Sequence, residues 1–166
     1  MTSPIVTATC LPLRPPRAWP GAVVYAGVPL VLANIPGSVA FAVNPNTAVD
    51  IGLTRVPLPP WVFVVVWAVI HAGMGLAAWQ LRRSTRDGDA CVPLALLVVG
   101  YLQTNLFWLS DGLRSVAAAD ATGLLLATVT TWVFARHSRA AARWLLPWLV
   151  WMPITLTIKI IALALP

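Results

Sequence analysis

The stretch WLLPWLVWMPITLTIKIIALAL, residues 144–165, contains one charged side chain, Lys159, and is otherwise uncharged and mostly apolar. About 20 such residues are enough for a helix to cross the hydrocarbon core of a bilayer. The stretch is too long for a strand of a membrane barrel and lacks strict alternation, so a helix is the structure that satisfies its backbone hydrogen bonds in lipid. Four more apolar segments precede it, at about 19–43, 59–81, 91–111 and 114–135. The sequence therefore predicts an all-α integral membrane protein, a bundle of five transmembrane helices.

The composition supports one membrane domain. The chain has 166 residues, of which 59% are hydrophobic and 10% charged, and its mean hydropathy is +0.82. Soluble domains carry about 25% charged residues, so this balance excludes a disordered chain and argues against a water-soluble fold. We expect a single membrane domain over residues 1–166, with residues 1–18 as a flexible N-terminal segment. Cys10 and Cys91 have no metal-ligand spacing, and we expect two unpaired residues.

The charges are distributed as expected for a topology signal. Ten Arg and one Lys stand against five Asp, a net charge of +6, and nearly all lie between the apolar segments. A nucleic-acid-binding protein would gather basic residues on one face with aromatic residues among them, so no nucleic acid is expected as a partner. Most arginines fall on one predicted side of the membrane: Arg14, Arg17, Arg82, Arg83, Arg86, Arg136, Arg139 and Arg143. Because positive residues favour the cytoplasmic side, we expect the N-terminus in the cytoplasm, the C-terminus outside, and residues 44–58 as an irregular flap over the outer end.

Three ionisable side chains lie inside the predicted spans: His71, Asp120 and Lys159. A charge at this depth costs several kcal/mol, so such residues usually face the interior of the bundle. Asp120 and Lys159 lie at similar depth, roughly 9 Å from the outer ends of their helices at a rise of about 1.5 Å per residue. Two compatible interpretations are open. The residues form a structural ion pair between the fourth and fifth helices, or Lys159 meets a ligand carboxylate while Asp120 sets its charge state.

Polar and aromatic residues on the helix faces predict a ligand pocket in the outer half of the bundle. Tryptophans near the span ends are assigned to the belt at the membrane surface: Trp19, Trp61, Trp79, Trp132 and Trp144. Trp67 and Trp151 lie too deep for this belt. Pro29 and Pro36 remove backbone hydrogen bonds and are expected to bend the first helix around a cavity. The residues expected to bind the ligand are Pro36, Trp67, His71, Asn105, Trp108, Asp120, Trp148, Trp151, Thr155 and Lys159.

Short motifs in four predicted spans match the pattern of one known membrane family. Residues 141–151, AARWLLPWLVW, resemble that family's entry into its last helix, and residues 59–63, PPWVF, resemble the double-proline opening of its second. Asn105 and Trp108 fit the Asn-x-x-aromatic pattern of the third helix, and Asp120 fits the acidic residue of the fourth. The chain thus resembles the TspO/MBR family, the tryptophan-rich sensory proteins that are also called translocator proteins or peripheral benzodiazepine receptors.

This resemblance, over about residues 28–163, implies a membrane receptor or carrier for tetrapyrroles such as protoporphyrin, with a sensory, regulatory or transport role in a bacterial cell membrane. It implies no required cofactor and no metal, with a porphyrin or haem-like molecule as the ligand. The expected partners are a tetrapyrrole or other hydrophobic small molecule, the lipid bilayer and a second copy of the chain. The small residues Ala117, Ala118, Ala119 and Gly123 would permit close helix contact in such a homodimer.

Two alternatives to a binding protein stay open. Some family members are described as promoting light- and oxygen-dependent porphyrin breakdown, and in such an enzyme Trp67 and Trp151 would be the candidate catalytic residues. The other alternative is a scaffold whose interior is full. We favour a binding protein, because the sequence offers no nucleophile–base pair, metal cluster or phosphate-binding loop. The chain departs from the family pattern in having no aromatic residue in 44–58 and in carrying His71 and Lys159 where Tyr and Asn are common.

Overall fold

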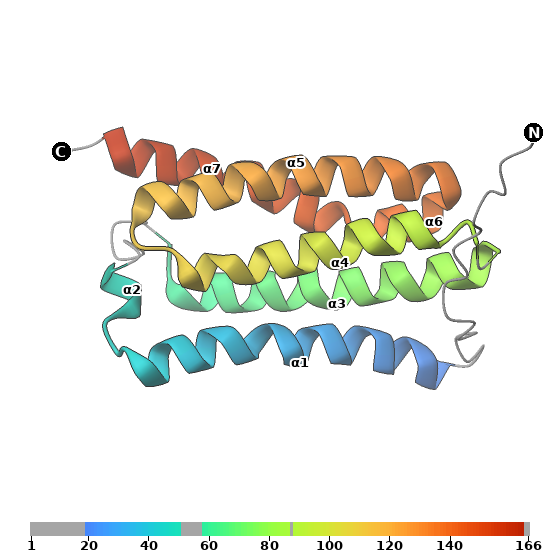
Figure 1. Cartoon of the computed structure of the whole chain (residues 1–166), viewed down its shortest axis with the longest axis horizontal. Coiled ribbons are helices and arrows are strands. Elements are labelled where there is room, and N and C mark those ends of the chain that lie inside the picture. Colours follow the sequence, from blue (N-terminus) through green and yellow to red (C-terminus); the bar gives the residue numbers. More distant parts are fainter. Residues whose placement is uncertain (1–18, 51–57, 87, 165–166) are drawn as a thin grey trace, which may run out of the picture.

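The computed structural model of the chain describes residues 19–50, 58–86 and 88–164, and the regular structure within these ranges is helical. Its elements are α1 (Trp19–Val43), α2 (Thr47–Asp50), α3 (Pro60–Ser84), α4 (Cys91–Leu106), η2 (Phe107–Leu109), α5 (Leu113–His137), α6 (Arg139–Arg143) and α7 (Leu146–Ala164). Five stretches are long and apolar enough to cross a membrane. Figure 1 shows the long helices side by side along the longest axis of the molecule, with α1 at one edge. The predicted all-α, five-helix membrane fold is confirmed.

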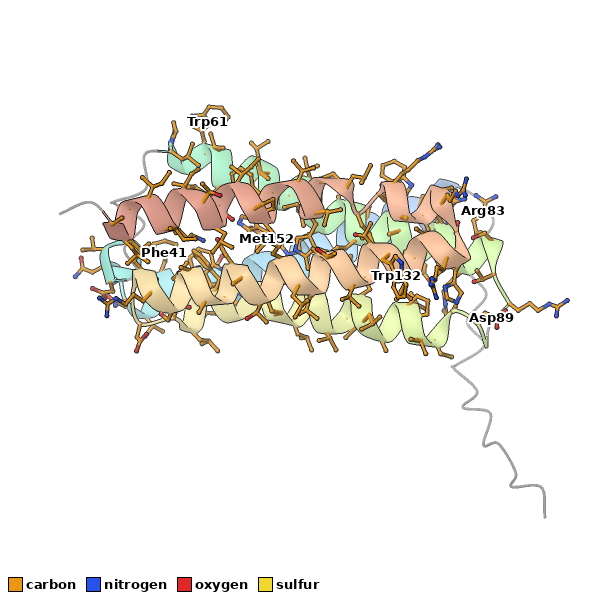
Figure 2. The ribbon with its side chains drawn as sticks, turned by 90° about the horizontal axis from the view of Figure 1, so that it is seen from above. Phe41, Trp61, Arg83, Asp89, Trp132 and Met152 are labelled. Carbon is orange, nitrogen blue, oxygen red and sulfur yellow. The ribbon has the colours of Figure 1, made fainter. Side chains whose placement is uncertain are left out.

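The two ends of the bundle differ in charge. Figure 2 places Arg83, Asp89 and Trp132 at one end and Phe41 and Trp61 at the other. α3 and α5 both end at the end of the bundle where Arg83 lies, and the last turn of each helix carries two basic residues. The short helix α6, with an arginine at each terminus, follows at the same end. We call this the arginine end and the opposite one the α2 end, after the helix that lies there. Arg14, Arg17 and Arg55 lie outside the described residues.

Tryptophans assigned to the membrane-surface belt lie at both ends. Trp61 at the α2 end and Trp132 at the arginine end are exposed, as a belt requires. The Arg136 guanidinium lies 3.9 Å from the Trp132 ring centroid, and Arg83 lies 4.6 Å from that of Trp79. These cation–π contacts hold positive groups beside rings that sit between the apolar and polar zones.

Helix boundaries follow the backbone chemistry of proline and glycine. α1 covers Trp19–Val43, the residues of the first predicted segment. The third predicted segment is an α-helix only to Leu106 and tightens into η2 before Gly112, whose φ of 156° few other residues adopt. The last segment was expected to begin at Trp144. Instead α6 ends at Arg143 and α7 begins at Leu146, because Pro147 has no backbone N–H and fits in the first turn of a new helix.

The contact between α1 and α3 depends on a proline and a glycine. α1 continues through Pro29 and Pro36. Since Pro29 has no N–H, it cannot donate to the carbonyl of Tyr25, four residues earlier. That carbonyl faces Gly75 of α3, where a Cβ would overlap it. The missing side chain of Gly75 therefore lets the two backbones come close together.

The centre of the bundle is built around Trp148 of α7. Trp148 is fully buried, and its ring covers Gly100 of α4, where a Cβ would collide with it. Gly123 of α5 lies against the Met152 methyl group and the Gln103 side chain. Small residues on α4 and α5 thus make room for large side chains of α7 and α4.

Two expectations are revised, one for the segment 44–58 and one for Cys91. Residues 44–58 were expected to be irregular, but α2 forms within them: the Asn44 side chain donates to Asp50 at 2.6 Å, and the Thr47 hydroxyl lies 3.1 Å from the Ala40 carbonyl. Residues 51–57 of that flap lie outside the described residues. Cys91 was expected to be unpaired but is disulfide-bonded. Cys10, like the whole N-terminal segment 1–18, lies outside the described residues.

Candidate functional site

A buried ion pair joins α5 to α7 in the half of the bundle nearer the α2 end. The Lys159 ammonium group donates to the Asp120 carboxylate, and the two side chains are only 2% and 4% exposed. The Phe107 ring centroid lies 5.1 Å from the Lys159 nitrogen, which adds a cation–π contact from η2. Asp120 and Lys159, which were predicted to lie at similar depth, are thus in direct contact. Three donors on an ammonium group leave two for further acceptors after this bond is made.

A second cluster surrounds His71 on α3. The ring stacks on Trp67 at 5.4 Å between centroids and meets Tyr101 of α4 edge to face at 5.6 Å. His71 Nε2 and Thr104 Oγ1 share a hydrogen bond at 3.2 Å. The Tyr101 hydroxyl in turn donates to the Pro29 carbonyl at 3.3 Å. The cluster therefore links α1, α3 and α4, and packing and a hydrogen bond hold His71 in place.

Further aromatic rings lie at the α2 end. Trp108 of η2 meets Phe41 of α1 edge to face at 5.6 Å and Phe107 at 5.1 Å. Its ring also lies over Gly37, where an added Cβ would be 2.8 Å from it. The half-buried Pro36 precedes this glycine in α1. The first helix thus supplies a flat, side-chain-free surface for Trp108.

Two tryptophans of α7 are buried with their indole nitrogens unpaired. Trp148 and Trp151 are 0% and 8% exposed, and neither Nε1 has a hydrogen-bond partner among the described residues. Trp151 meets Phe63 of α3 edge to face at 5.9 Å. Gln103 of α4 donates to the Ala119 carbonyl at 2.5 Å, while its own carbonyl oxygen has no partner there. Because an unpaired buried polar group is costly, these atoms are places where a water or a ligand atom would be stabilised.

The polar side chains of two predicted ligand-binding residues form hydrogen bonds with carbonyl groups of their own helices. Asn105, a polar residue at depth, has a hydrogen-bond partner on its own helix: its amide donates to the Tyr101 carbonyl one turn earlier at 2.8 Å. The Thr155 hydroxyl lies 3.2 Å from the Met152 carbonyl and 3.3 Å from that of Trp151. Both side chains are therefore bound to their own helices. Gln103 was not among the candidates, although it is a polar residue at depth by the same criterion that selected Asn105.

A cavity of about 350 Å³ lies between α1, α3 and α4. None of the predicted ligand-binding residues lines it. Its lining consists of Val24, Tyr25, Val28, Pro29, Leu32, Met74, Gly75, Leu97, Val98 and Tyr101. The cavity borders the His71 cluster at Tyr101, which lines the cavity and whose ring meets the His71 ring.

These features define a five-helix integral membrane protein with an aromatic interior and a buried ion pair. The chain belongs to the TspO/MBR family, whose family model matches residues 26–163. The match covers nearly the whole chain and agrees with the resemblance found in the motifs. No solved structure matches the chain. Family membership supports a receptor-type role for hydrophobic ligands in the bilayer.

Proposed function

We propose that the protein is a membrane receptor or carrier that binds a planar tetrapyrrole in the half of the bundle nearer the α2 end. The observation that carries this proposal is the set of half-buried aromatic rings there, above all Trp67 on α3 and Trp108 on η2. Both tryptophans are only half-buried, so part of each residue is not covered by protein. A large flat apolar ligand gains both area burial and stacking against such surfaces.

The charged group expected to meet a ligand carboxylate is Lys159. In the structure its ammonium group is bound to Asp120, but two donors are left for an acceptor that approaches beside Phe107. An anionic ligand would then share the ammonium group with Asp120. A neutral ligand of the same shape would leave the ion pair unchanged.

Titration with protoporphyrin IX, followed by quenching of tryptophan fluorescence, tests this proposal on the full chain in mild detergent. We expect Trp67→Leu and Trp108→Leu to weaken binding about tenfold each, since one lost stacking partner costs roughly 1–1.5 kcal/mol. Trp132→Leu, at the arginine end, is the matched control and should bind as the wild type does. Equal binding by all four proteins would refute the site. Loss of porphyrin absorbance under illumination, abolished by Trp67→Leu, would favour the enzyme instead.

The orientation is part of the same proposal. The described arginines of the predicted cytoplasmic side gather at one end, so we place that end and the N-terminus in the cytoplasm. A membrane-impermeant maleimide should label Asn46→Cys in intact cells and Arg86→Cys only after permeabilisation. The reverse pattern would invert the topology.

A homodimer completes the proposal. Two of the four small residues expected to form its contact face the interior of one chain, because Ala117 is buried and Gly123 is covered by Met152 and Gln103. The second copy would therefore bind through another helix face. Light scattering of the detergent-solubilised protein, corrected for bound detergent, should give twice the mass of one chain, and the mass of a single chain would contradict the dimer.

A further inference from the structure

The cavity between α1, α3 and α4 opens sideways, toward the bilayer. Val24, Val28 and Leu32 of α1 and Val98 of α4 form its rim, and all four side chains are about half exposed. Met74 and Leu97, both buried, form its floor. The part of the rim that α1 supplies runs from Val24 to Leu32. These residues lie five and thirteen positions after the start of the helix, which is about 8 to 20 Å along its axis. Because α1 has 25 residues and is about 38 Å long, this range runs from the hydrocarbon of the leaflet at the arginine end to the middle of the bilayer.

The shape of the cavity follows from two contacts of α1. One is the close approach of the Tyr25 carbonyl to Gly75 of α3. The other is the hydrogen bond from the Tyr101 hydroxyl to the Pro29 carbonyl, which joins α1 to α4 nearer the middle of the bundle. These contacts hold α1 in place on both sides of the space without filling it.

The lining offers almost nothing to a polar ligand. It is made of aliphatic side chains, Met74, Gly75 and the apolar parts of two tyrosines, and the Tyr101 hydroxyl is already used by Pro29. A polar group placed there would lose its hydrogen bonds to water without replacement. An alkyl chain would lose nothing and would restore the dispersion contacts that an empty space forfeits.

We propose that this cavity is a binding site for one acyl chain of a bilayer phospholipid from the leaflet at the arginine end. The headgroup would then lie near Arg83, eight residues beyond Gly75 on α3, about 12 Å along the helix axis. Arg83 is exposed and lies at that end of the bundle, as Figure 2 shows. A positive group at the membrane surface favours anionic phospholipids. The site is separate from the proposed tetrapyrrole site and does not depend on it.

The test measures the phospholipid that stays bound to the full chain through mild-detergent purification, by native mass spectrometry. Val28→Trp and Val98→Phe place larger side chains at the rim of the cavity. Val99→Trp is the control, because Val99 is equally exposed on α4 but does not line the cavity. Two filling variants on different helices keep the test informative if one of them fails to fold.

We expect the wild type and Val99→Trp to retain one phospholipid that both filling variants lose. We also expect added phosphatidylglycerol to raise the melting temperature of the wild type more than that of Val98→Phe. Equal retention in all four proteins, or retention of a free fatty acid in place of a phospholipid, would overturn the proposal. Protoporphyrin quenching should be the same in Val98→Phe and wild type, so failure of the lipid site and failure of the tetrapyrrole site are distinguishable.

Discussion

Replacing Lys159 by Met should strongly destabilise the protein. The substitution leaves the Asp120 carboxylate 4% exposed, without its ammonium partner, in the apolar interior between α5 and α7. Removing one member of a buried ion pair costs about 3–5 kcal/mol, because the other charge stays buried and uncompensated. For a chain of this size each kcal/mol corresponds to roughly 2–4 °C in melting temperature, so we expect a drop of about 6–20 °C.

The double variant Asp120→Asn/Lys159→Met separates the ion pair from the loss of side-chain contacts. With both charges removed, the interior holds no unpaired charge, and the melting temperature should recover most of the loss. The control is Thr157→Met, which adds the same side chain to an exposed position two residues earlier on α7. Thermal unfolding in detergent, read by intrinsic fluorescence at one scan rate, gives the four values of the cycle: the wild type, Asp120→Asn, Lys159→Met and the double variant. The reasoning is refuted if Lys159→Met melts with the wild type, or if the double variant loses the sum of the single losses.

Two further predictions concern packing and hydrogen bonding in the core. Gly100→Ala should cost about 1–3 kcal/mol, because its Cβ would collide with the fully buried Trp148 ring. Gly27→Ala is its control: nothing lies within 4 Å of the added atom, so we expect unchanged or slightly raised stability, and equal melting of the two variants would contradict the packing. Thr104→Val should cost about 1–3 kcal/mol by leaving the buried His71 nitrogen unpaired, and a melting temperature equal to that of the wild type would show that the bond contributes nothing.

The parts of the fold that could be predicted are those set by local chemistry. Apolar length fixed the number of spans, because lipid leaves no other structure for such segments. The pairing of Asp120 with Lys159 could be anticipated from depth and opposite charge alone, since an isolated charge is so costly there. The start of the last helix was missed by two residues. Pro147 determines it, and the rule that proline is tolerated in the first turn would have placed it correctly.

The parts that could not be predicted depend on contacts between helices. The amide of Asn105 donates to the carbonyl of Tyr101 on its own helix, and helical periodicity does not distinguish this outcome from a bond to another helix. The cavity beside α1 arises because the Tyr25 carbonyl approaches Gly75 while Tyr101 bonds to Pro29. Neither contact has a signature in the spacing of residues along one helix.

The central claim is that aromatic rings near the α2 end form the ligand site. The most direct measurement is the structure of the full chain in complex with protoporphyrin IX. We predict that the macrocycle contacts Trp67 and Trp108, with one propionate beside Lys159. A macrocycle bound in the cavity between α1, α3 and α4, or on the outer surface of the bundle, would contradict the claim.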